Sequence, residues 1–211
     1  MKFFLLSLLI VLSGAAKEIK SDLHLNVTYG GSLSTVIVGH VLGSMGFKAD
    51  IHRFSNIDEM TQMELVLYAK KPFDPKAFTQ ELNAHHIMVR HAELQNREWT
   101  MELDASQASW NLPAITQDEG AQVERTNVPV WFKVNQTVGI AVEAPYNSKW
   151  YPEIAVLDDK MNVLASLKES TSTDRMAFLL PERAMYLKVS NANGMKMLKE
   201  GMWIESANQE Q

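Results

Sequence analysis

The sequence predicts an α+β protein: a ferredoxin-like βαββαβ domain followed by an all-β sandwich or jelly roll. Three observations predict this class. Residues 23–103 alternate apolar and polar side chains in several runs, and two stretches with helical spacing interrupt them. From residue 122 onward only short alternating runs remain, separated by turn residues. We therefore expect a signal peptide at 1–16, a ferredoxin-like domain at 22–104, a linker at 105–120 and a β-sandwich domain at 121–207.

The first residues have the pattern of a secretory leader. Lys2 precedes an apolar run from Phe3 to Leu12, and small residues from Ser13 to Ala16 suit cleavage by signal peptidase. The run is too short for a permanent membrane helix, and no later stretch is long enough either. We expect a mature protein without a membrane span, located in a bacterial periplasm or secreted.

Composition excludes several classes of function. The chain has no cysteine, so disulfides, thiolate metal sites and a cysteine nucleophile are excluded. Its formal net charge is −5 and it has no basic patch, so we expect no binding to nucleic acid. Stability must come from packing.

The first part begins with a predicted strand at 23–29, in which leucines and a valine alternate with polar residues. Gly30 and Gly31 then allow a tight turn, and helical spacing continues up to Gly46. Two further strands are predicted at 47–52 and 63–69, joined by a short polar loop.

A second helix is predicted to begin at Asp74. Asp74 is a favourable N-cap, Pro75 suits the first helical position, and Phe73 can pack on Phe78 across the start of the helix. A fourth strand is predicted at 87–94, then a turn at 95–98 and a fifth strand at 99–103. The βαββαβ order places both helices on one side of the sheet and leaves the other side open to water or a partner.

The second part reads as seven short strands with turn residues between them. A hairpin turn is predicted at 158–162. The expected strands lie at 130–134, 138–143, 154–157, 163–167, 175–180, 185–189 and 202–205.

The order of these strands resembles a small β-sandwich family, the bacterial pre-peptidase C-terminal domain. The residues that carry the resemblance are 130–134, 138–144, 153–158 with 163–165, and 184–190. The sequence departs from the family at Arg183-Ala184, where the family usually turns on a glycine. The resemblance implies an accessory domain that binds or stabilises, without catalytic residues.

All six histidines lie in the first part, and four residues there form a candidate metal site. His24, His52 and Glu64 are predicted on the open sheet face, and His91 can join them. Imidazole and carboxylate ligands suit zinc, nickel or copper(II). A solvated polar face explains the same residues, and we expect no bound cofactor. His85 and His86, at the end of the second helix, are predicted to cap it.

The segment 145–152 contains three large aromatic residues between two prolines. Tyr146, Trp150 and Tyr151 can form a platform that stacks on a sugar or grips a peptide. The alternative is a plug that buries the rings over the open end of a sandwich.

No catalytic motif is complete in the sequence. Residues 30–34 do not form G-x-S-x-G, and there is no H-E-x-x-H. We therefore expect a non-enzymatic exported binding or assembly module, whose partner is an envelope protein, a peptide or a carbohydrate. The alternatives are a periplasmic transition-metal-binding protein that uses the open sheet face, and a hydrolase of unrecognised type.

Overall fold

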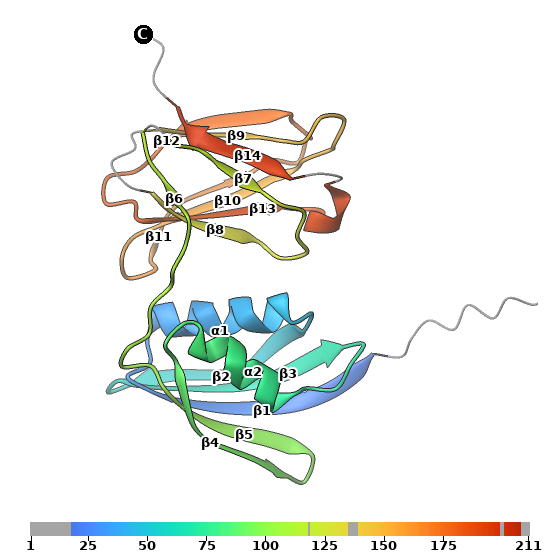
Figure 1. Ribbon diagram of the computed structural model, residues 1–211, viewed down its shortest axis with the longest axis vertical. Helices are drawn as coiled ribbons and strands as arrows, with labels where there is room; N and C mark the ends of the chain where they lie inside the picture. The colour runs from blue at the N-terminus through green and yellow to red at the C-terminus, as the bar shows by residue number, and fades with distance from the viewer. Residues whose placement is uncertain (1–17, 118, 135–138, 199–200, 208–211) are drawn as a thin grey trace, which may run out of the picture.

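The computed structural model describes residues 18–117, 119–134, 139–198 and 201–207. The described chain forms layers (Figure 1). A first sheet, sheet A, lies at one end of the molecule, two helices cover one of its faces, and two further sheets, B and C, lie beyond the helices. The predicted leader at 1–16 falls outside the described residues.

Sheet A has five strands in the order β2-β3-β1-β5-β4. The central strand β1 pairs antiparallel with β3 and parallel with β5. The alternation predicted for β1 is confirmed, since Leu23, Leu25 and Val27 are buried under the helices. The bounds are β1 Ile19–Thr28, β2 Lys48–Ile57, β3 Met60–Ala69, β4 Met88–Gln95 and β5 Glu98–Asp104.

The two helices are α1, Ser32–Ser44, and α2, Pro75–Asn83. The predicted start of α2 is confirmed: the Asp74 carboxylate accepts hydrogen bonds from the backbone N–H groups of Lys76 and Ala77, at 2.9 and 3.2 Å. Phe73 and Phe78 lie with their ring centroids 5.4 Å apart. Sequence-local signals therefore set where α2 begins.

The hairpins of sheet A turn on residues other than glycine. Asp58 and Glu59 between β2 and β3 have φ of 48° and 64°, and Asn96 and Arg97 between β4 and β5 have φ of 51° and 71°. Two consecutive residues with positive φ are the mark of a type I′ turn, which suits the twist of paired strands. The polar loop predicted between 52 and 63 is therefore wrong, because both strands continue to this turn.

Sheets B and C pack face to face around a shared hydrophobic core. Their strand orders are β11-β10-β13-β8-β6 and β12-β9-β14-β7. All seven strands predicted here are found, with ends that differ by two residues at most, and a short 3-10 helix, Met195–Met197, precedes the last. The strands are β6 Ala114–Ile115, β7 Ala121–Val123, β8 Val130–Val134, β9 Gly139–Glu143, β10 Pro152–Leu157, β11 Val163–Lys168, β12 Arg175–Leu179, β13 Tyr186–Asn191 and β14 Met202–Ser206.

The predicted class, an α+β ferredoxin-like domain plus a sandwich, is wrong. The structure is mostly β, with 49% of the residues in strands, 13% in helices, and three sheets in the described part. Two physical reasons account for the error. The hairpin strands β2 and β3 extend to ten residues each, which raises the strand content. The strand expected as the fourth, β4, forms a sheet edge, whereas β5 takes the place beside β1.

The segment expected as a linker, 105–120, contacts both parts of the molecule. Trp110 is buried in the core beneath sheet A, and its ring centroid lies 5.0 Å from that of Trp131 on β8. β6 then pairs in parallel with β8. None of the described helices is long and apolar enough to cross a membrane.

Candidate functional site

The face of sheet A turned away from the helices, which we call the open face, carries the candidate site. Strand alternation places polar side chains there, because their neighbours in sequence are buried under the helices. The register then sets which of them meet. His24 on β1 lies between Glu64 on β3 and Thr100 on β5, and Asn26 lies between Gln62 and Glu102.

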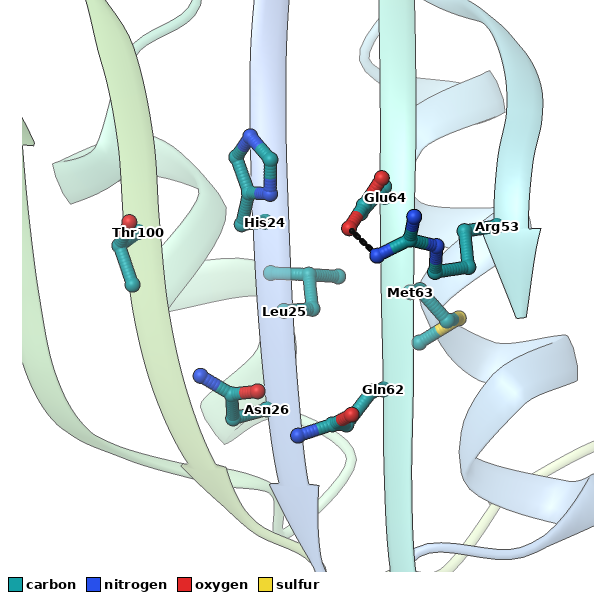
Figure 2. A pocket seen from close by; sticks show the side chains of 8 residues that line it. All are labelled: His24, Leu25, Asn26, Arg53, Gln62, Met63, Glu64 and Thr100. Atoms are coloured by element: carbon teal, nitrogen blue, oxygen red, sulfur yellow. Dashed lines mark hydrogen bonds and ion pairs between the residues drawn. The ribbon is translucent and has the colours of Figure 1, made fainter. Parts of the chain in front are cut away.

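The centre of the open face is hollowed by a depression of about 280 Å³. Figure 2 shows its side chains: Asn26 and Gln62 lie side by side, and the Arg53 guanidinium reaches to Glu64. Thr100 and His24 complete the polar lining. The depression therefore combines imidazole, hydroxyl, guanidinium and carboxamide groups from four strands.

Most charged groups in and around the depression are paired. Arg53 Nη1 lies 3.0 Å from Glu64 Oε1, and His24 Nε2 lies 3.6 Å from Glu98 Oε2. The side-chain amides of Asn26 and Gln62 have no hydrogen-bond partner among the described residues. Together with the Thr100 hydroxyl, these two amides remain free to bind among the described residues of the depression, and each amide offers both donors and an acceptor.

The four predicted metal ligands all lie in sheet A but do not converge. His24, His52 and Glu64 line a second depression of about 230 Å³ on the open face, together with Glu98. In the described chain, no three His, Asp or Glu side chains are grouped so that they could hold one ion. Glu64 is also engaged in an ion pair with Arg53.

His91 lies apart from the other predicted ligands. It is on β4, opposite Glu102 of β5, so the whole width of β5 separates it from His24. Its Nε2 lies 3.5 Å from Glu93 Oε2. His52 sits where the pairing of β2 with β3 shifts register between Ile51 and Arg53. A bulge of this kind re-aims side chains, and the sequence pattern alone did not locate it.

The three predicted aromatic ligand residues do not form one surface. Trp150 is fully buried, and its indole N–H donates to the carbonyl of Ser190 at 2.9 Å. Tyr146 is 87% exposed, whereas Tyr151 is half-buried. The platform is therefore wrong for Trp150, because its ring fills the core between sheets B and C, as the plug alternative expected.

Sequence reasoning missed a cluster of rings between the helices and sheet B. The Trp110 ring lies 5.3 Å from His40 on α1, 6.4 Å from His85 and 5.0 Å from Trp131, between centroids. His85 Nδ1 is buried without a hydrogen-bond partner in the described structure. The apolar character of the predicted linker was the one signal that could have revealed this cluster.

Burial determines the protonation of these two histidines. Burial lowers the pKa of His40 below its usual value, and the neighbouring His85 lowers it further. The pKa of His85 is also lowered by burial, and although the Glu81 carboxylate raises it, His86 lowers it again. Both imidazoles are therefore neutral in the folded protein near neutral pH.

Family models, curated proteins and solved structures were compared with the whole chain, and none of them matches it. The chemistry of the described residues therefore carries the functional argument. A hollow polar sheet face with two free amides can hold hydroxyl-rich or amide-rich surfaces, because such groups need both donors and acceptors.

Proposed function

We propose that this protein is an exported, non-catalytic binding or assembly module that holds a polar partner on the open face of sheet A. The observation that carries the proposal is the pair of free amides, Asn26 and Gln62, in the central depression. The partner class is a protein segment, a peptide or a carbohydrate of the bacterial envelope. The leader pattern at 1–16 supports a place in the periplasm or outside the cell.

The charges near the depression favour an uncharged polar partner. Arg53 is already paired with Glu64, and His24 Nε2 lies 3.6 Å from Glu98 Oε2, so an anionic ligand would have to compete with these carboxylates. Peptide groups and sugar hydroxyls can bind without disturbing these contacts, because they are uncharged. They also match the donors and acceptors of amide side chains. The resemblance of residues 130–190 to an accessory β-sandwich domain agrees with a binding role for the whole chain.

Photocrosslinking in the source cells tests this proposal. A photoreactive residue replaces Glu102, which is exposed on the open face opposite Asn26, and in a control it replaces Gln122 on β7, which is also exposed. We expect a discrete crosslinked product from position 102 alone, and we expect Asn26→Ala and Gln62→Ala each to reduce it. No product at position 102, or the same product from both positions, would overturn the proposal.

A second candidate is a transition-metal-binding protein. His24, His52, Glu64 and Glu98 line one depression, and imidazole with carboxylate suits zinc or copper(II), but these side chains would have to move together to hold one ion, because no three of them are so grouped in the described structure. Titration of the mature protein with zinc or copper(II), followed by calorimetry, tests it: saturable binding that is lost in His24→Ala and in His52→Ala supports this candidate. Titration without saturation rules it out.

A further inference from the structure

A cleft lies between α1 and sheet B, and its lining includes no residue of sheet A. Its volume is about 310 Å³, within the usual range of small-molecule sites, roughly 300 to 1,000 Å³. Its lining comes from α1 and from the strands β8 and β13 with the chain just before β8: Val36, Gly39, His40, Gly43, Val128, Pro129, Trp131 and Lys188.

Two glycines of α1 create this hollow. Gly39 and Gly43 are one turn apart and lie on the same side of the helix. A Cβ at Gly43 would come 3.3 Å from Val128 Cγ1, whereas a Cβ at Gly39 would meet nothing within 4 Å. The backbone of α1 is thus uncovered at the cleft, and an added side chain at position 39 would enter free space.

The cleft is apolar with a cationic rim. Lys188 Nζ lies 5.7 Å from the centroid of the Trp131 ring, which is a cation–π contact. Lys188 has no ion pair with any described residue, and no acidic residue lines the cleft. The positive charge of Lys188 contributes to lowering the pKa of Glu153, but the ion-pair partner of Glu153 is Lys168, at 2.8 Å.

From these features we infer that the cleft binds a small apolar molecule with one anionic group. The apolar part lies against Val36, Val128 and the part of Trp131 that lines the cleft, and the anion meets the Lys188 ammonium. Aliphatic side chains beside an indole ring favour a compact apolar group such as a ring system. The volume is too small for a helix or a folded partner, so the occupant is a small organic acid.

This site is separate from the proposed partner site, because α1 and sheet A lie between them (Figure 1). A partner on the open face and a ligand in the cleft can therefore be present or absent independently. Their tests use different probes and different variants, so failure of one leaves the other standing.

Binding of 1-naphthoate to the mature chain tests the inference, with 1-naphthalenemethanol as the neutral counterpart of the same ring. We expect saturable binding of the acid by calorimetry, at least about tenfold tighter than that of the alcohol. Ligand-observed NMR gives an independent readout of the same binding.

Variants of two cleft residues, Gly39 and Lys188, test whether 1-naphthoate binds in the cleft. Gly39→Leu fills the hollow, and Gly39→Ala is its small-side-chain control; Lys188→Gln removes the charge, and Lys188→Arg keeps it. We expect Gly39→Leu and Lys188→Gln each to weaken binding by about tenfold or more, and the two controls to bind within about threefold of the original protein. Circular dichroism checks that each variant folds.

Two outcomes would overturn the inference. One is that 1-naphthoate does not saturate the protein up to about 5 mM, which corresponds to negligible affinity. The other is that Gly39→Leu, folded as judged by its circular dichroism, binds the acid as tightly as Gly39→Ala, since a filled cleft cannot be the binding site.

Discussion

At the scale of single residues, Trp150 shows how an aromatic side chain can be structural and still sit in a loop. Its ring is fully buried between sheets B and C, and its N–H satisfies the carbonyl of Ser190. Buried indoles commonly need such a partner, because an unpaired polar group in an apolar core is costly. Tyr146, four residues earlier, has no such constraint and faces solvent.

Replacing Trp150 therefore affects stability. We expect Trp150→Ala to lower the free energy of unfolding by about 3 to 5 kcal/mol, since it removes a large buried ring and leaves a cavity. Trp150→Phe retains most of the volume but leaves Ser190 O without its donor, so an intermediate loss of about 1 to 3 kcal/mol is expected. Urea unfolding followed by circular dichroism measures both.

Tyr146→Ala is the control for the same loop. Because Tyr146 is 87% exposed, its removal should change the free energy of unfolding by less than about 0.5 kcal/mol. Equal urea midpoints for Trp150→Ala and Tyr146→Ala would contradict the packing role of Trp150.

At the scale of elements, α2 depends on its first residues. The Asp74 carboxylate satisfies two backbone N–H groups that have no partner within the helix, and Phe73 anchors the approach to the helix against Phe47, Phe78 and Trp99. Because α2 has only nine residues, it depends on the packing of its buried Phe78 and Leu82, and the cap adds to that stability at the first turn.

Removal of this cap has a defined expected cost. We expect Asp74→Ala to lower the free energy of unfolding by about 1 kcal/mol and to speed hydrogen exchange at the N–H groups of Lys76 and Ala77. Asp74→Ser keeps an oxygen acceptor at the N-cap and should restore most of both. Unchanged exchange at residues 76 and 77 in Asp74→Ala would speak against the cap.

The elements also show what local sequence determines. The start of α2 and the bounds of β8 follow from capping residues and alternation, and the structure confirms both. The turn at Asp58 and Glu59 was missed because it reaches positive φ without glycine or asparagine. Which strand lies beside β1 is set by long-range packing, and no local pattern distinguishes β4 from β5.

In the candidate site too, local sequence patterns predict some features, whereas long-range packing sets the others. Alternation correctly predicts that His24 and Glu64 share the open face, since period-2 spacing follows from strand geometry. How far His91 lies from them depends on strand order, so the sequence could not give it. The free pair formed by Asn26 and Gln62 depends on the register of β1 with β3, which is likewise a long-range property.

At the scale of the whole molecule, the cluster of rings between the helices and sheet B connects the two halves of the chain. We call this cluster, formed by His40, His85, Trp110 and Trp131, the joint. The core beneath sheet A also includes Trp131, Leu157, Met161 and Tyr186 from the second half of the chain. His40 from α1 and His85, which follows α2, both lie against Trp110 in this joint. Protonation of either imidazole places a charge in a partly apolar contact, and Lys188 already contributes one positive charge beside Trp131.

The two histidines of the joint, His40 and His85, predict that the free energy of unfolding decreases in acid. The pKa values of His40 and His85 are lowered in the fold, so the unfolded chain binds more protons as the pH falls below about 6.5. Their contribution to stability is therefore complete above that pH and decreases as the pH falls toward their folded pKa values. Glu81 opposes this effect at His85, whereas His86 and the mutual repulsion of His40 and His85 reinforce it.

Urea midpoints measured from about pH 8 to about pH 5 test the prediction, because histidine is the side chain that normally titrates in this interval. We expect the midpoint to fall with the pH, and the fall to be smaller in the double variant His40→Gln, His85→Gln. Gln122→Ala, an exposed substitution on β7 that adds and removes no titratable group, should leave the slope unchanged. If the double variant kept the full slope, the acid sensitivity would arise outside the joint, since only these two imidazoles lie against Trp110.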